Sequence, residues 1–257
     1  MVSMRALAAL VTGASRGIGR QIAMDLSRSG HYVIGISRAS PDLDSLELEL
    51  SDSDAGGKVL ALDLDAPDAA NTIIEFLDVH VDILIHNVGG NLGLTEPLSS
   101  GKDFMRVISH NMSLSIDLNS HLIPLMQARG WGRVCHVSSV SALENQGPPA
   151  YSAAKASINS YVRGLGRYVA KDGVVVTSLM PGAVLTRGGY WDETSQQRPG
   201  HVEKFISERM AIGRLGTVEE ISSVAAFLVS EASSFMAGTC VLVDGGQGRV
   251  IQMVEQS

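Results

Sequence analysis

A tyrosine and a lysine at helical spacing are the residues of this sequence best suited to acid–base chemistry. Tyr151 and Lys155 stand four residues apart in the segment "YSAAK", so a helix would carry both on one face. A tyrosine hydroxyl with an ordinary pKa of about 10 exchanges protons poorly near neutral pH. A lysine ammonium one turn away favours the phenolate and lowers that pKa. The pair therefore indicates a general acid or base that acts on an oxygen atom.

A glycine-rich loop near the start of the chain offers a place for a phosphate. Gly13, Gly17 and Gly19 lie in "TGASRGIG", between the apolar run "ALAALV" and a helical pattern. A helix that begins directly after a strand points its free N–H groups and positive dipole end at the loop, and side chains there would block a pyrophosphate. The loop predicts a dinucleotide site, although its spacing differs from the common G-x-G-x-x-G form.

Seven apolar runs alternate with helical patterns along the whole chain. Each run is continuously apolar, as is typical of strands covered on both faces. Right-handed crossovers between such strands predict an α/β fold: a single Rossmann-type domain over 1–257, with a doubly wound parallel seven-stranded sheet and helices on both faces. The expected strands lie in the runs 6–13, 31–38, 58–65, 81–90, 132–139, 173–182 and 238–246.

Composition and charge exclude several other classes of protein. The net charge is −7 and no block of consecutive Lys or Arg occurs, so a nucleic-acid partner is not expected. No apolar run reaches the roughly 18 residues of a membrane helix, and we interpret the first apolar run as a strand, not a signal peptide. Cys135 and Cys240 lie in predicted strands without metal-ligand spacing. They indicate buried free thiols, no metal site and a cytoplasmic protein.

Several motifs in the expected order resemble those of the classical short-chain dehydrogenase/reductase family. "TGASRGIG" at 12–19 matches the family's T-G-x-x-x-G-x-G loop, "HNVGG" at 86–90 is similar to N-N-A-G, and "YSAAK" matches Y-x-x-x-K. "PGAVLT" at 181–186 is similar to the segment beside the nicotinamide. The resemblance covers nearly the whole chain and extends to 3-oxoacyl-[acyl-carrier-protein] reductases through "ERMAIGRLGTVEEI" and the final "VDGG". It implies hydride transfer between a nicotinamide cofactor and a carbonyl or secondary alcohol.

The resemblance also implies a role for each site residue. Tyr151 is expected to exchange the proton of the carbinol oxygen, Lys155 to hold the nicotinamide ribose, and Asn111 to link that lysine to solvent through a water. Val184 would offer backbone groups to the carboxamide, and Thr186 would contact the cofactor's phosphates. The implied cofactor-binding residues are Gly13, Ser15, Arg16, Gly17, Ile18, Gly19, Arg38, Asp63, Leu64, Asn87, Gly89, Tyr151, Lys155, Pro181, Gly182, Val184 and Thr186.

The residues after the second predicted strand favour NADP(H) over NAD(H). NAD-preferring enzymes of this fold place a carboxylate here for the ribose hydroxyls, whereas this run ends in Ser37 and Arg38. The guanidinium groups of Arg38 and Arg16 suit a 2′-phosphate. Asp63 is expected beside the adenine, as the cap of the following helix, or in both roles.

Two serines compete for the role of hydrogen-bond donor to the substrate oxygen. The family's usual separation of thirteen residues before the tyrosine selects Ser138, whereas the resemblance of "SSVSA" to S-S-V-x-G selects Ser139. Successive strand side chains point to opposite faces, so only one of the two can serve. We favour Ser139, because loop length varies more easily than a strand end.

His86 and Val88 depart from the N-N-A-G motif. His86 ends a predicted buried strand and shows no partner in the sequence, so we expect a hydrogen-bonded structural histidine there. The same expectation holds for His136 in "VCHVSS". Val88 is expected to alter the packing on the cofactor side.

The region 186–214 lacks a clear strand and predicts a lid over the substrate. Its segment "RGGYWDETSQQRPGH" is unlike that of the carrier-protein enzymes, and Tyr190, Trp191, Asp192 and His201 would suit a polar ligand. A keto-sugar or other polar ketone is therefore the alternative to a 3-oxoacyl thioester. A non-catalytic dinucleotide-sensing regulator is disfavoured, because the chain keeps both the tyrosine and the lysine. We expect a homotetramer, with a dimer as the alternative.

Overall fold

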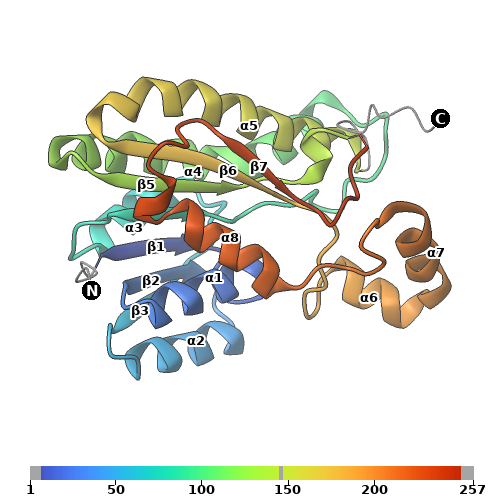
Figure 1. Ribbon diagram of the computed structural model, residues 1–257, viewed down its shortest axis with the longest axis horizontal. Coiled ribbons are helices and arrows are strands. Elements are labelled where there is room, and N and C mark those ends of the chain that lie inside the picture. Colours follow the sequence, from blue (N-terminus) through green and yellow to red (C-terminus); the bar gives the residue numbers. More distant parts are fainter. Residues whose placement is uncertain (1–6, 145–146, 250–257) are drawn as a thin grey trace.

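A parallel seven-stranded sheet in the order β3-β2-β1-β4-β5-β6-β7 forms the centre of the molecule (Figure 1). The computed structural model describes residues 7–144 and 147–249. Its strands are β1 (Ala8–Thr12), β2 (Tyr32–Ser37), β3 (Gly57–Ala61), β4 (Ile83–His86), β5 (Gly132–Val137), β6 (Val174–Pro181) and β7 (Cys240–Val243). The order reverses between β1 and β4, and such switch points bind ligands at the carboxyl ends of strands. The predicted doubly wound sheet and its seven strands are confirmed.

Helices cover both faces of the sheet (Figure 1). One face carries α1 (Gly17–Arg28), α2 (Pro41–Ser51) and α8 (Val218–Leu228). The opposite face carries α3 (Ala69–Phe76), α4 (Gly101–Arg129) and α5 (Pro149–Val169). Two short helices, α6 (Tyr190–Gln197) and α7 (Pro199–Arg209), stand apart from the sheet in the region 186–214 (Figure 1). We call α6, α7 and the loop before them the lid, after the role that the sequence predicts for 186–214.

Alternate residues of each strand supply two apolar cores. In β1, Val11 packs in the cluster that includes Ile22 of α1, whereas Leu10 packs in the cluster that includes Leu118 of α4. All four side chains are fully buried. Because side chains point to opposite faces in turn, a strand covered by helices on both sides has no polar face. This explains the continuously apolar runs of the sequence.

Local signals fix where helices begin and end. The Ser40 Oγ atom accepts a hydrogen bond from the Leu43 N–H at 3.2 Å, and Pro41 occupies the first turn of α2. This serine satisfies one of the free N–H groups at the helix start. The long helix α4 ends at Gly130, whose φ of 70° favours glycine.

The two cysteines are free, but only one of them is buried. Cys135 lies inside β5, where burial raises the pKa of its thiol to about 12. Cys240 is half-buried because β7 is the last strand of the sheet and has a neighbour on one side only. The expectation of two buried thiols is therefore wrong for Cys240. Among the described residues, no helix is both long and apolar enough to cross a membrane.

Candidate active site

The glycine-rich loop carries the chain from β1 into α1 and lines a cleft of about 860 Å³. Gly13 and Gly17 have φ angles of 67° and 58°, a backbone region that favours glycine. The free N–H groups of α1 begin here, which suits a pyrophosphate. The volume lies in the range of ligand and cofactor sites. The predicted cofactor residues that line the cleft are Gly13, Ser15, Arg16, Gly17, Ile18, Arg38, Asp63, Leu64, Asn87, Gly89 and Thr186.

Gly19 lies next to this cleft but has a packing role. A Cβ atom at this position would lie 2.2 Å from the Gly13 carbonyl oxygen and 2.4 Å from Nδ2 of Asn87. Asn87 Nδ2 itself donates to that carbonyl at 3.2 Å. Glycine is therefore needed for the close approach of α1 to the loop, and Gly19 is not among the residues that line the cleft.

The end of the cleft beside β2 is rich in hydroxyl and guanidinium groups. Arg16 and Arg38 both line it, and the hydroxyls of Ser15 and Ser37 lie 2.9 Å apart. No carboxylate of the described residues pairs with Arg38, which is exposed. This chemistry fits the 2′-phosphate of NADP(H).

Asp63 lines the cleft and closes a turn at its edge. Its Oδ1 atom accepts the N–H of Asp65 at 3.2 Å. Helix α3 starts several residues later, with Asp68 as its N-cap residue. Asp63 therefore does not cap that helix, and the alternative beside the adenine is the one that its position supports.

Tyr151 lies in the first turn of α5 and faces the carboxyl end of β5. Burial raises the pKa of the Tyr151 phenol, and the nearby Ser139 side chain lowers it by a smaller amount. Ser139 also accepts the N–H of Ser141 at 3.1 Å and so starts the short helix Val140–Ala142. Its hydroxyl is thus held at the position from which a substrate oxygen could be shared with Tyr151.

Ser138 has a different partner on the other side of the strand. Its hydroxyl donates to the backbone carbonyl of Lys155 at 3.0 Å, and the residue is buried. This bond ties the end of β5 to α5 and leaves the hydroxyl directed away from Tyr151. Of the two alternatives, the geometry therefore supports Ser139.

Lys155 is buried beneath the tyrosine. Its Nζ atom donates to the Val137 carbonyl at 3.0 Å and lies 5.6 Å from the centre of the Tyr151 ring. Burial lowers the pKa of Lys155 to about 8. The lysine thus keeps its proton at neutral pH close to the phenol, and it can lose that proton near pH 8.

Asn111 lies in the middle of α4 and holds the loop that follows β4. Its Nδ2 atom donates to the carbonyls of Gly90 and Val107, both at 2.8 Å, and Oδ1 accepts the Gly90 N–H at 3.2 Å. At Gly89, a Cβ atom would lie 2.4 Å from Oδ1 of Asn111 and 2.7 Å from Nζ of Lys155. Gly89 therefore lets the asparagine and the lysine approach each other.

Backbone hydrogen bonds hold the segment after β6 in place without using the N–H or the carbonyl of Val184. Gly216 donates its N–H to the Ala183 carbonyl and accepts the Leu185 N–H, both at 2.9 Å. Neither bond uses the amide or carbonyl of Val184, so these groups face away from Gly216. Pro181 ends β6 and Gly182 donates to the Val243 carbonyl at 2.9 Å. The predicted turn after β6 is therefore present, and its contact with a nicotinamide stays a prediction.

His86 and His136 belong to a buried polar cluster on the α4 face of the sheet. Nε2 of His86 lies 2.9 Å from Oδ1 of Asn119, and Nδ2 of Asn119 lies 3.2 Å from both Nε2 of His136 and the Tyr161 hydroxyl. Burial lowers the pKa of His86 to about 4 and that of His136 well below its usual value. Both histidines are therefore neutral and hydrogen-bonded, as expected for structural residues.

The lid uses much of its own polar and aromatic surface internally. The Trp191 and Phe205 rings lie 4.3 Å apart, and Oδ2 of Asp192 accepts the Gly188 N–H at 2.8 Å. Tyr190 packs on Trp191 at 5.1 Å and stays exposed. Trp191 and Asp192 thus stabilise the lid, and their suitability for a polar ligand is lower than the sequence suggested.

The last described residues include Gln247 and Arg249, which we call the strap because they join separate parts of the site. Oε1 of Gln247 accepts the Ala183 N–H at 2.7 Å, beside the end of β6. Arg249 donates to the Glu208 carbonyl of α7 at 2.8 Å and, through its N–H, to the carboxylate of Glu144 in the loop after β5. The C-terminal segment therefore contacts three parts of the site.

The structure adds cleft residues that the sequence did not single out. Leu92 has a φ of 53°, and His110 pairs with Asp65 at 2.7 Å. One indication for Arg187 lay in the sequence: it directly follows Thr186, which was predicted to contact the cofactor's phosphates. The added lining residues are Ala39, Ser40, Asp42, Asp65, Leu92, His110, Arg187 and Gly189. Within the described chain, no group of His, Cys, Asp or Glu is arranged to hold a metal.

The fold and the site define a dinucleotide-binding α/β protein with a serine, a tyrosine and a lysine beside its cleft. A family model described as enoyl-(acyl carrier protein) reductase matches residues 13–247. The chain belongs to the short-chain dehydrogenase/reductase family.

Similar proteins include reductases of different substrates. A 3-oxoacyl-[acyl-carrier-protein] reductase FabG of Pseudomonas aeruginosa is 29% identical, over 95% of this chain and 98% of that protein. The structure of a 3-oxoacyl (acyl-carrier-protein) reductase from Agrobacterium tumefaciens with NADP bound has a TM-score of 0.87 and 31% identity, covering 95% of both chains. L-sorbose reductase from Gluconobacter frateurii, complexed with NADPH and L-sorbose, has a TM-score of 0.86 and 25% identity, covering 94% of this chain and 96% of that chain.

Proposed function

We propose that this protein is an NADP(H)-dependent oxidoreductase that interconverts a carbonyl group and a secondary alcohol. The observation that carries the proposal is the position of the buried Lys155, whose Nζ atom lies 5.6 Å from the centre of the Tyr151 ring, together with the Ser139 side chain close to the same phenol. This group lies at the carboxyl ends of the strands, where the fold places its ligands. The bound cofactor would supply or accept the hydride.

Each side chain of the site has a distinct task in this reaction. Tyr151 gives a proton to the substrate oxygen in reduction and takes it back in oxidation. Ser139 donates a hydrogen bond to the same oxygen and so stabilises the charge that develops on it. Lys155, protonated below about pH 8, favours the phenolate through its charge and holds the ribose. Asn111 fixes the loop that presents Gly89 to the lysine.

NADP(H) is the proposed cofactor because arginines stand where NAD-binding enzymes place a carboxylate. Arg16 and Arg38 line the cleft end beside β2, and the solved reductases of Agrobacterium tumefaciens and Gluconobacter frateurii contain NADP and NADPH. Guanidinium groups bind a phosphate through two parallel hydrogen bonds. Val184 and Thr186 would hold the nicotinamide end and the phosphates.

A 3-oxoacyl thioester is the proposed substrate class. The support is the similarity to the 3-oxoacyl-[acyl-carrier-protein] reductases over nearly the full chain. A keto-sugar is the second candidate, supported by the similarity to L-sorbose reductase. It gains less from the lid, because Trp191 and Asp192 are engaged within the lid itself.

We also propose that 1–257 act as one domain with 186–214 as a lid, and that the protein is a cytoplasmic homotetramer. Phe235 is fully exposed and Tyr168 is 74% exposed, and β7 is the last strand of the sheet, with a neighbour on one side only. Exposed aromatic residues and an unpaired strand edge each suit a contact between subunits. Light scattering after size-exclusion chromatography would determine the number of subunits, and a monomer would contradict the proposal.

A substrate screen with purified protein tests the function. NADPH consumption is followed by absorbance with acetoacetyl-CoA, with a set of keto-sugars and with small ketones. We expect turnover with the thioester and with NADPH in preference to NADH. Turnover of the keto-sugars alone would select the second candidate. Tight NADPH binding without turnover of any carbonyl would instead favour the dinucleotide-sensing regulator.

A further inference from the structure

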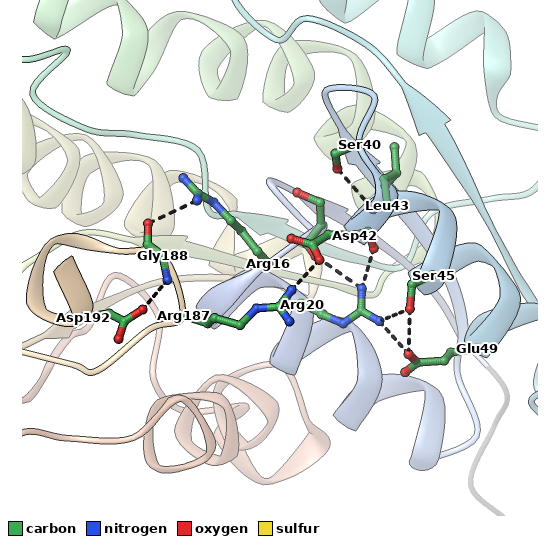
Figure 2. A network of polar contacts seen from close by, with 11 residues as sticks. Arg16, Arg20, Ser40, Asp42, Leu43, Ser45, Glu49, Arg187, Gly188 and Asp192 are labelled. Carbon is green, nitrogen blue, oxygen red and sulfur yellow. Dashed lines mark hydrogen bonds and ion pairs between the residues drawn. The ribbon is translucent and has the colours of Figure 1, made fainter. Parts of the chain in front are cut away.

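The lid reaches the phosphate end of the cleft through one arginine. Nη2 of Arg187 lies 2.5 Å from Oδ1 of Asp42 in the first turn of α2, although the two residues are 145 positions apart in the chain (Figure 2). Both residues line the dinucleotide cleft together with Arg16, Arg38 and Ser40. Arg187 thus stands among the groups that would meet a 2′-phosphate.

A second contact joins the lid to the glycine-rich loop. Nη1 of Arg16 donates to the Gly188 carbonyl at 3.3 Å, and the N–H of Gly188 donates to Asp192 in α6 at 2.8 Å (Figure 2). The segment from Thr186 to Gly189 is therefore attached to the cofactor loop on one side and to the lid helix on the other. A ligand that moves Arg16 or Arg187 acts directly on the lid.

Asp42 holds the side chain of Arg187 at this end of the cleft. Its backbone carbonyl accepts a hydrogen bond from Arg20 at 2.6 Å, and Arg20 is itself paired with Glu49 at 2.6 Å (Figure 2). Arg20 is thus occupied, and Arg187 supplies the positive charge that faces the Asp42 carboxylate. Without Arg187, that carboxylate would stand unpaired at the place where a phosphate must enter.

The Arg187–Asp42 pair is easily broken by a stronger anion. The Arg187 side chain is 84% exposed and that of Asp42 is 38% exposed. Exposed ion pairs contribute little free energy, whereas a phosphate monoester carries more charge than a carboxylate and binds a guanidinium through two parallel bonds. A phosphate beside Arg16 and Arg38 would therefore take the guanidinium of Arg187 from Asp42.

We propose that Arg187 is a specificity-determining residue for the cofactor's 2′-phosphate, held by Asp42 in the unliganded protein and transferred to the phosphate on binding. The inference rests on the proposed use of NADP(H). It adds a third guanidinium, carried by the lid, to the two that the sequence indicated. Because the same segment leads into α6, the 2′-phosphate would also draw the lid toward the cleft.

Two adenosine nucleotides test this without any turnover. Adenosine 2′,5′-bisphosphate carries the additional phosphate and adenosine 5′-monophosphate lacks it, so the ratio of their dissociation constants by calorimetry measures recognition of the 2′-phosphate alone. We expect the wild-type protein to prefer the bisphosphate and Arg187→Ala to lose about tenfold of that preference. Arg187→Lys is expected to lie between them, because it keeps the charge and loses the fork. Arg209→Ala, which removes a lid arginine outside the cleft, should leave the ratio unchanged.

Variants of Asp42 distinguish a direct contact between Arg187 and the 2′-phosphate from a general effect of charge in the cleft. Asp42→Asn should strengthen bisphosphate binding, because it releases Arg187 and removes a negative charge. The double variant Asp42→Asn/Arg187→Ala should prefer the bisphosphate less strongly than Asp42→Asn does. The factor should be the same as the one that separates Arg187→Ala from the wild-type protein.

Two outcomes would overturn the inference. The first is an unchanged ratio in Arg187→Ala, which includes an equal loss of affinity for both nucleotides, and the second is a double variant as selective as Asp42→Asn. If the wild-type protein itself binds both nucleotides equally, the NADP(H) assignment fails as well, which distinguishes the two failures.

Discussion

The side-chain amide of Asn111 forms hydrogen bonds with both backbone polar groups of Gly90. Its Nδ2 atom donates to the Gly90 carbonyl at 2.8 Å, and its Oδ1 atom accepts the Gly90 N–H at 3.2 Å. The neighbouring Gly89 is thereby held against Lys155, with no room for a side chain. The asparagine is thus a positioning residue for the loop as well as the expected link to solvent. The two adjacent glycines differ sharply in the space around them, which makes them a matched pair for mutagenesis.

Gly89→Ala should lower turnover by about a hundredfold or more, because an added methyl would push Asn111 and Lys155 out of position. At Gly90, the nearest atom to an added Cβ would be Nε2 of His110 at 3.9 Å. Gly90→Ala is therefore expected to keep most of the activity. Steady-state kinetics of both variants checks this, and equal activity in the two would contradict the geometry.

Tyr151→Phe should lower turnover by about 10²- to 10⁴-fold while NADPH binding persists, because the ring remains and only the proton donor is lost. Tyr32→Phe is the control, since that tyrosine begins β2 at the opposite end of the sheet. Kinetics and fluorescence titration with NADPH measure the two effects separately. Substantial turnover in Tyr151→Phe would remove the proposed acid–base role.

Replacing the two adjacent serines one at a time should lower activity in one variant and stability in the other. Ser139→Ala is expected to reduce kcat by about 10²- to 10³-fold with little change in unfolding free energy, because its hydroxyl serves the reacting oxygen. Ser138→Ala leaves the buried Lys155 carbonyl without this donor and should cost about 1–3 kcal/mol of stability. Urea unfolding and kinetics of both variants provide the test. The reverse pattern would assign the catalytic role to Ser138.

Stability should fall in mild acid because of the buried histidines. Burial lowers the pKa of His86 from 6.5 to about 4, so the unfolded chain binds more protons than the folded one in this range. Its contribution is fully present above pH 6.5 and is lost as the pH falls toward 4, by about 3 kcal/mol in total. His136 acts in the same direction.

The variant His86→Gln keeps a hydrogen-bonding side chain and should show a flatter dependence of unfolding free energy on pH. Urea unfolding between about pH 7 and pH 5 measures the slope. His201→Gln, on the exposed surface of α7, should keep the wild-type slope. An unchanged slope in His86→Gln would mean that this imidazole is not the group that titrates.

The sheet was predictable because each of its strands is apolar on both faces, a property that one run of sequence carries by itself. The glycine-rich loop and the tyrosine–lysine pair were predictable for the same reason, since their spacing is local. The choice between Ser138 and Ser139 was not, because it depends on the direction of each side chain at the last residues of β5. Only the bond from Ser138 to the Lys155 carbonyl shows which one turns away.

Contacts between distant segments were beyond the sequence. Asn119, the partner of His86 and His136, lies on another element, and its separation from the two histidines is not marked by any motif. Arg187 and Asp42 meet only because the loop after β6 reaches the first turn of α2. The internal packing of Trp191 on Phe205 likewise needs the turn between α6 and α7.

The strap formed by Gln247 and Arg249 has a practical consequence for anyone who purifies the protein. These residues touch the end of β6, helix α7 and the loop after β5, so a disturbance of this segment reaches three parts of the site at once. We therefore expect an affinity tag at the amino end of the chain to alter the kinetics less than one at the carboxyl end. Kinetic constants measured with a C-terminal tag should be compared with those of the tag-free protein.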